Sequence, residues 1–134
     1  MIERKNFTKF EIRVGDINYG GHMGNDKALL LFHDARIRFL NEIACTEKDI
    51  GNGTGIIMTE AHVYFLKEIF LHDILLASVS VSDVSTAAFV VNYSFTRESD
   101  GKEVLKGSTK ILAYDYQRQK VTRIPEGLAE IFVK

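Results

Sequence analysis

The feature that most constrains the fold is a single strong helical period followed by almost nothing but strand patterns. The period is set by apolar residues at 3.6-residue spacing, namely Ala28, Phe32, Ala35, Phe39 and Ile43. Leucines at positions 29–31 fill the other sides, so the first half of this long helix is expected to be buried nearly all round. A helix buried on all sides needs other elements around it, and the strands are the elements available.

Strand patterns lie on both sides of this helix. Before it, Phe10, Ile12 and Val14 alternate with charged residues, which predicts a half-buried first strand. After it, the alternating apolar sets are Ala61, Val63 and Phe65, then Ala77, Val79 and Val81, then Phe89, Val91, Tyr93 and Phe95.

Turn signals complete the order of elements. Asp100-Gly101 predicts a hairpin into a strand over 104–114, and Pro125 predicts the start of a short closing helix. We therefore predict an α+β fold in which an antiparallel sheet of about five strands wraps one long central helix.

Composition excludes several classes of protein. At 134 residues and 46% hydrophobic content, residues 1–134 are predicted to form one domain. The net charge is −1 and the basic residues are dispersed, so no nucleic-acid partner is expected. No apolar run approaches the roughly 18 residues of a membrane span, and the charged start Met1–Lys5 lacks a signal-peptide core. A soluble, cytoplasmic protein without membrane association is predicted.

Neither cysteine nor histidine predicts a metal site. Cys45 is the only cysteine, so no intrachain disulfide can form, and we expect a small buried apolar residue. The spacings of His33, His62 and His72 match no common ligand pattern. We therefore expect no metal and no cofactor.

The loop over 13–26 is the candidate site. Its glycines permit close approach of the backbone to a ligand. Either Asn25 or Asp26 is expected to cap the helix that follows. The N–H groups of the first turn would then suit a carbonyl oxygen that gains negative charge. The alternative is a turn in which Asn and Asp serve only as turn formers.

Three segments in order resemble a known family. Arg13–Asn25 resembles the signature Asp-x-Asp-x-x-Gly-His-x-x-Asn, and Phe32–Arg36 resembles Phe-Glu-Glu-Ala-Arg. Ala61–Leu66 through Asp73–Leu75 resembles a strand pair with a Tyr-Leu stretch before a Gly-Asp-x-Leu turn. Over nearly its whole length the chain is similar to the hotdog-fold thioesterases, in the branch typified by 4-hydroxybenzoyl-CoA thioesterase. The resemblance implies hydrolysis of an acyl-CoA to a free acid and CoA.

One departure from the family signature affects the site. The second aspartate, the family's usual catalytic carboxylate, falls at Asn18, whose amide cannot act as a base. We expect Asn18 and His22 to position the carbonyl or the attacking water, and N–H groups over 23–25 to polarise the carbonyl. Asp16, Gly24 and Asn25 are the predicted substrate-binding residues, and Asp16 and Asn25 occupy defined positions of the signature.

Glu60 is the predicted base. If buried among the apolar residues around it, its carboxyl group would have a raised pKa. The alternative is a solvent-facing strand residue. Asp16 matches a family aspartate that is mainly structural, and Asp34 is expected to pair with Arg38 at i,i+4 spacing.

The resemblance also implies an assembly. Hotdog subunits pair their sheets edge to edge, so a homodimer is predicted, which can double to a tetramer. Two alternatives remain open for the function. Asn18 is compatible with an acyl-CoA-binding protein that has lost catalysis. A hydratase of enoyl thioesters ranks below it, because that branch's motif is not found here.

Overall fold

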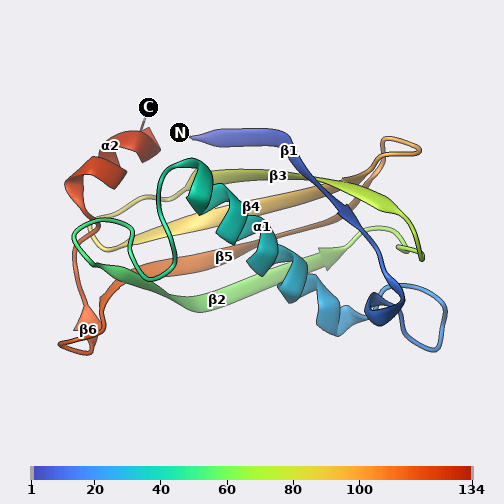
Figure 1. Ribbon diagram of the computed structural model, residues 1–134, viewed down its shortest axis with the longest axis horizontal. Helices are drawn as coiled ribbons and strands as arrows, with labels where there is room; N and C mark the ends of the chain where they lie inside the picture. Colours follow the sequence, from blue (N-terminus) through green and yellow to red (C-terminus); the bar gives the residue numbers. More distant parts are fainter. Residues whose placement is uncertain (1, 134) are drawn as a thin grey trace.

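The computed structural model describes residues 2–133 as a curved antiparallel sheet wrapped around one helix (Figure 1). The strands are β1 (Glu3–Glu11), β2 (Gly55–Phe65), β3 (Ile74–Ser82), β4 (Ala88–Arg97), β5 (Glu103–Asp115) and β6 (Lys120–Val121). The helices are α1 (Ala28–Glu42) and α2 (Glu126–Val133), with 3-10 turns η1 (Val14–Asp16) and η2 (Asn25–Lys27) before α1. The sheet order is β1-β3-β4-β5-β2, and β6 pairs with β5. This architecture confirms the predicted fold class.

The core lies between α1 and the concave face of the sheet. Every second residue of the central strands faces α1 and is buried, as the alternation predicted. The helix contributes the residues of its predicted period, and Ala28, Phe32, Ala35 and Phe39 are fully buried. The ring of Phe32 stacks on that of Tyr93, with centroids 4.4 Å apart.

A glycine in β5 lets the helix approach the sheet closely. A Cβ atom at Gly107 would lie 2.6 Å from Cε2 of Phe32 and would overlap the carbonyl oxygen of His62 on the neighbouring strand β2. Gly107 is therefore required by packing from two sides. The absence of a side chain at this position makes room for the Phe32 ring.

Several predictions about the elements are confirmed. The hairpin at Asp100-Gly101 joins β4 to β5, with Gly101 at φ +70°, and Pro125 directly precedes α2. Cys45 is buried, and burial raises the pKa of its thiol. Asp34 accepts a hydrogen bond from Arg38 across one helical turn at 2.7 Å.

Other predictions about the elements are wrong. The helix predicted to be long has only 15 residues, extended at its start by the turn η2. Strand β1 ends at Glu11, so Val14 lies in η1 and is 78% exposed. Leu30 is 58% exposed and Leu29 is also exposed, because the sheet covers one side of α1 and leaves these leucines on the other side. No helix among residues 2–133 is long and apolar enough to cross a membrane.

Strand β2 forms one edge of the sheet, at the bottom of Figure 1. Within residues 2–133 its ladder partner is β5 alone, so the backbone groups on its other side have no strand beside them. Its second half is exposed on both faces and continues into a loop with further exposed apolar residues. The exposed large apolar side chains of this stretch are Met58, Tyr64, Phe65, Leu66, Phe70 and Leu71.

The packing at Gly107 predicts the outcome of two matched glycine substitutions. Gly107→Ala is expected to destabilise the fold by about 3 kcal/mol or more, because the strand backbone and the Phe32 ring cannot both move away. Gly127→Ala, in α2 with open space around the new Cβ, should raise stability by up to about 1 kcal/mol. Urea unfolding followed by circular dichroism measures both, and equal stabilities would contradict the packing argument.

Candidate functional site

The loop before α1 is held in shape by its own backbone. Ile17 and Met23 form an isolated β-bridge, and the N–H of Asn18 donates to the carbonyl of His22 at 2.9 Å. Asp16 closes the start of the loop, where its Oδ2 accepts a hydrogen bond from the N–H of Arg13 at 2.9 Å. The side chain of Asp16 is thus used structurally, as the family resemblance implied.

Asn18 and His22 present polar atoms on either side of Gly20. Oδ1 of Asn18 accepts a hydrogen bond from the N–H of Gly20 at 2.8 Å. A Cβ atom on Gly20 would lie 3.2 Å from this Oδ1 and 3.2 Å from Nε2 of His22. The two predicted catalytic side chains of the loop are therefore close together, and the missing side chain of Gly20 leaves room beside them.

The hydrogen bond made by His22 defines its tautomer. Its Nδ1 lies 3.2 Å from the carbonyl oxygen of Met23. A carbonyl oxygen only accepts, so Nδ1 carries the proton and donates it. In the neutral ring Nε2 is then an acceptor, free to take a proton from a water molecule.

The backbone N–H groups predicted to polarise a carbonyl are only partly free. The N–H of Met23 donates to the carbonyl of Ile69 at 2.6 Å, and that of Gly24 donates to Asp16 at 2.9 Å. Among residues 2–133 no acceptor is found for the N–H groups of Asn25 and Asp26.

The predicted cap by Asn25 or Asp26 is wrong. Gly24 occupies the cap position of η2 and Lys27 that of α1, and neither helix start has a side-chain cap. Of the donors predicted over 23–25, only Asn25 has a free N–H group, and the second free donor, Asp26, follows it.

A cavity of about 250 Å³ adjoins these donors. It is lined by His22, Met23 and Asn25 from the loop and by residues 65–69, which follow β2. A bridge between His22 and Phe70 joins the two segments. We call this space the loop cavity. It unites two of the predicted site residues, His22 and Asn25, whereas Gly24 and Asn18 belong to the same loop without lining the cavity.

Glu68 is a site residue that the sequence patterns did not predict. Glu68 and Lys67 line the loop cavity, and both are exposed. Arg97 fixes their segment, because its guanidinium donates to the carbonyl of Glu68 and to Asp73 at 3.1 Å. The only signal in the sequence was that Lys67 and Glu68 directly follow the Tyr-Leu stretch. This signal becomes informative only once the end of β2 is known to lie beside the loop.

Glu60 lies on the other face of the sheet. It pairs across the ladder with Lys110, on the face away from α1, and lies 3.5 Å from His62. Its side chain is 55% exposed, so the burial on which its assignment as base depended is absent. Within one chain the structure does not bring Glu60 to the loop cavity, and its role as base stays a prediction.

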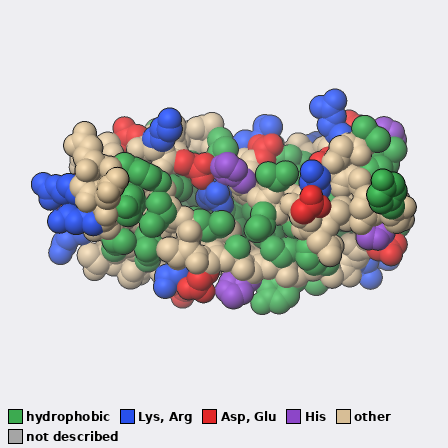
Figure 2. Space-filling view, turned by 90° about the horizontal axis from the view of Figure 1, so that it is seen from below, with side chains coloured by type: hydrophobic (Ala, Val, Ile, Leu, Met, Phe, Trp, Pro, Cys, Tyr) green, Lys and Arg blue, Asp and Glu red, His purple; other side chains and the backbone are tan. Residues whose placement is uncertain are grey.

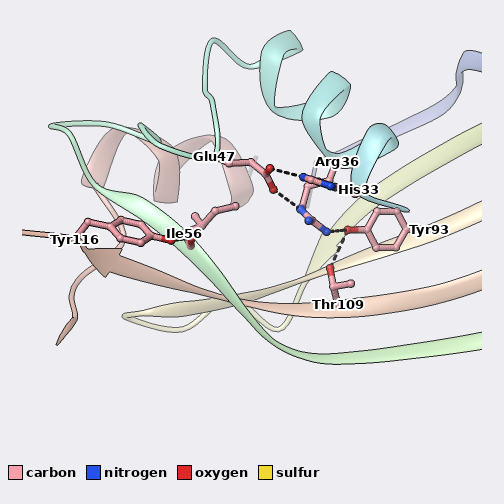
Figure 3. A network of polar contacts seen from close by, with 7 residues as sticks. All are labelled: His33, Arg36, Glu47, Ile56, Tyr93, Thr109 and Tyr116. Atoms are coloured by element: carbon pink, nitrogen blue, oxygen red, sulfur yellow. Dashed lines mark hydrogen bonds and ion pairs between the residues drawn. The ribbon is translucent and has the colours of Figure 1, made fainter. Parts of the chain in front are cut away.

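A polar network lies beneath the middle of α1 (Figure 3), and its members Arg36, Tyr93 and Thr109 are buried. Arg36 donates from Nε to Glu47 at 2.8 Å and from Nη1 to the hydroxyl of Tyr93 at 3.0 Å. His33 lies 2.7 Å from the other oxygen of Glu47, and the Tyr93 hydroxyl lies 2.8 Å from that of Thr109. The network links α1 to the loop before β2 and to the sheet.

Burial and hydrogen bonding shift the pKa values of this network in opposite directions. Burial by itself would raise the pKa of Glu47, but hydrogen bonds from Arg36 and His33 lower it below its usual value. The pKa of Arg36 is raised, since Tyr93 and Glu47 outweigh its desolvation. Desolvation raises the pKa of Tyr93. Arg36 and Glu47 are therefore an ion pair at neutral pH.

Comparison with known proteins agrees with this architecture. The family model of the Thioesterase-like superfamily matches residues 12–132. Among curated proteins, none matches the chain.

Several solved structures share the fold. Slr0204, a 1,4-dihydroxy-2-naphthoyl-CoA thioesterase from Synechocystis, is 15% identical, with 95% of this chain and 94% of that one covered and a TM-score of 0.84. A DHNA-CoA thioesterase from Staphylococcus aureus is 20% identical, with coverages of 98% and 87% and a TM-score of 0.84. The protein SAV2348 from Staphylococcus aureus, in complex with CoA, is 18% identical, with coverages of 97% and 82% and a TM-score of 0.85.

The Glu47 ion pair predicts how stability depends on pH. Its pKa is lower in the folded chain than the usual 4.5, so its stabilisation is complete above the unfolded value and is lost as pH falls through the folded value. Glu47→Gln should cost about 1.5 kcal/mol at pH 7, and the difference from wild type should shrink below pH 4.5. Urea unfolding from pH 7 to pH 3 measures this, with the surface variant Glu42→Gln as control. A difference in unfolding free energy between wild type and Glu47→Gln that stays constant with pH would contradict the lowered pKa of Glu47.

Proposed function

We propose that this chain, which belongs to the thioesterase-like superfamily, hydrolyses an acyl-CoA thioester to a carboxylic acid and CoA. The observation that carries the proposal is the loop cavity. His22 and Asn25 line this cavity, and the same loop holds Asn18 and the second N–H group without an acceptor, that of Asp26. This is the set of groups that water attack on a carbonyl carbon requires.

The N–H groups of Asn25 and Asp26 would bind the carbonyl oxygen of the thioester. They are the first two residues of η2, which leads directly into α1, and the helix dipole adds positive potential at this end. Negative charge grows on this oxygen as water attacks, so the two donors stabilise the transition state more than the ground state. A donor of this kind is worth about 100- to 1000-fold in rate.

His22 and Asn18 would hold and activate the water. Nε2 of His22 accepts a proton from water as the new C–O bond forms, and Oδ1 of Asn18 orients the same molecule. The tetrahedral intermediate then collapses with cleavage of the C–S bond, and the CoA thiolate takes up a proton. In this scheme His22 performs the role that the sequence patterns predicted for Glu60. Glu68, at the mouth of the cavity, is the carboxylate that lies nearest to it.

The substrate we propose carries an aromatic acyl group. Two structural neighbours are named as thioesterases of dihydroxynaphthoyl-CoA, and a third is in complex with CoA.

In this chain Lys67 lines the loop cavity and is exposed, so its ammonium group can meet a phosphate of CoA at the surface.

A second candidate function is acyl-CoA binding without turnover. Asn18 favours it, because an amide stands where the family's usual catalytic carboxylate is expected. The two functions share the loop cavity and differ in whether a base is present. The hydratase alternative gains no support from the loop geometry.

We also propose that the chain forms a homodimer through β2. This edge has backbone groups that no strand of residues 2–133 pairs with, and exposed apolar residues border it. An unpaired apolar edge strand favours aggregation, and pairing with the same edge of a second copy prevents this. A two-fold axis near the middle of β2 would continue the sheet from one copy into the other, and two dimers can associate into a tetramer.

Turnover and the identity of the base are tested together. Wild type should release free thiol from a panel of acetyl-, octanoyl-, benzoyl- and naphthoyl-CoA. His22→Gln should lower kcat by about 100-fold or more, while KM changes little. Asn18→Asp places a carboxylate beside Nε2 and favours the protonated ring, so activity at pH 7 should fall and the pH optimum should rise.

Matched carboxamide variants decide between the rival bases. Glu68→Gln and Glu60→Gln remove one carboxylate each, on opposite faces of the sheet, and Glu98→Gln on the surface is the control. A loss in Glu60→Gln as large as that in His22→Gln would restore the assignment from sequence. Tight CoA-ester binding with no thiol release from any substrate would establish the binding function instead.

The proposed dimer is tested by the mass of the protein in solution. Size-exclusion chromatography with light scattering should give twice the chain mass at micromolar concentration. Tyr64→Lys combined with Phe65→Lys adds charges on both faces of the β2 edge and should give monomers, whereas Val121→Lys on β6 should not. A wild-type monomer would contradict the proposal.

A further inference from the structure

A second and larger cavity lies at the other end of β2. Its volume is about 530 Å³, within the range of about 300–1000 Å³ typical of small-molecule sites. The walls are mostly apolar and come from the start of β2, from β5 and from the segment after it, through Ile56, Ile57, Met58, Ile111 and Tyr116. We call this space the Arg36 cavity. Figure 2 looks from below onto this side of the molecule, where hydrophobic side chains adjoin a central group of acidic, basic and histidine side chains.

Arg36 supplies a buried donor to this cavity. The residue is only 7% exposed, and its Nε and Nη1 are used by Glu47 and Tyr93. No acceptor for Nη2 is found among residues 2–133. Every fully enclosed side-chain nitrogen and oxygen in that part of the chain has a partner, so Nη2 must face open space. Arg36 lines the cavity, and its guanidinium is held rigid by two bonds on its other sides.

The charges around Nη2 define the group that it can receive. Glu47 neutralises Arg36 at 2.8 Å, so a ligand carboxylate would be brought close to an existing carboxylate. Lys48, the other cation of the lining, is exposed, so solvent screens its charge. A neutral oxygen gains the hydrogen bond to a charged donor without that repulsion.

The distance along α1 between this cavity and the loop limits the acyl groups that could reach from one to the other. Ten residues separate Asp26 from Arg36, which is about 15 Å at 1.5 Å per residue. A long helical side chain leans toward the N-terminus of its helix and shortens this distance. An acyl group with a ring and a short linker fits such a separation better than acetyl does.

We infer that the Arg36 cavity receives the far end of the acyl group, and that Arg36 selects acyl groups ending in a neutral oxygen, such as a phenolic hydroxyl. This inference rests on the proposed thioesterase function for its substrate. The cavity itself can be tested without any turnover.

Binding of fragments tests the cavity directly. The probes are 4-propylphenol, propylbenzene and 4-propylbenzoate, followed by methyl NMR of the intact protein. We expect 4-propylphenol to shift the methyl signals of Ile56, Met58 and Ile111, and to bind about tenfold more tightly than propylbenzene. Propylbenzoate should bind more weakly than the phenol. Shifts confined to Met23 and Ile69 of the loop cavity, or tighter binding of the benzoate, would overturn the inference.

Variants separate the donor from the shape of the cavity. Arg36→Met keeps the length of the side chain and should make phenol and propylbenzene bind equally. Met58→Trp fills the cavity while leaving the ion pair intact, and should abolish binding of both even if Arg36→Met does not fold. Tyr64→Trp, on the outer face of the same strand, is the control and should bind like wild type. Retention of the phenol preference in Arg36→Met would refute the role of Arg36.

Kinetics link the cavity to the reaction. The matched substrates are 3-(4-hydroxyphenyl)propanoyl-CoA and 3-phenylpropanoyl-CoA. Wild type should favour the hydroxylated substrate about tenfold in kcat/KM, and the ratio should fall to about one in Arg36→Met. If both are hydrolysed with a ratio that does not depend on Arg36, the inference fails and the proposed function stands. If neither is hydrolysed while fragments still bind, the proposed function fails and the cavity remains a binding site.

Discussion

The structure depends on the close approach of one helix to one sheet at Gly107. The Phe32 ring lies on bare strand backbone there and stacks on Tyr93. This contact sets the depth at which α1 sits in the curved sheet. That depth in turn brings Arg36, one turn further along the helix, against the hydroxyl of Tyr93. Apolar packing and the buried ion pair are therefore consequences of the same geometry.

The loop before α1 illustrates how backbone hydrogen bonds define a site. A glycine-rich loop has many N–H groups, and most of those from Asp16 to Gly24 donate within the protein and hold the loop in shape. The N–H groups of Asn25 and Asp26 stay free where the chain enters its helix and the dipole is strongest. A capping side chain at position 24 could have accepted from the N–H group of Asp26, and Gly24 leaves that donor available.

Much of this was predictable from sequence, and the limits have physical causes. The helical period predicted the buried face of α1, and the alternation in β3 and β4 predicted their inner residues, because these patterns report which side of an element avoids water. Glu60 shows the limit of such patterns. Alternation places it on one face of a strand, but which face meets the helix is decided by register and by the bulge between Met58 and Glu60.

The sequence by itself determined the order of elements, the central helix, the polar loop before it and the family resemblance, since each is written in local spacing. Tertiary structure alone decided the partners that are distant along the chain. It placed Glu68 beside His22, directed the N–H groups of Met23 and Gly24 to Ile69 and Asp16, and left Nη2 of Arg36 facing a cavity. These facts depend on how strands pair and how deeply the helix packs, which no short stretch of residues encodes.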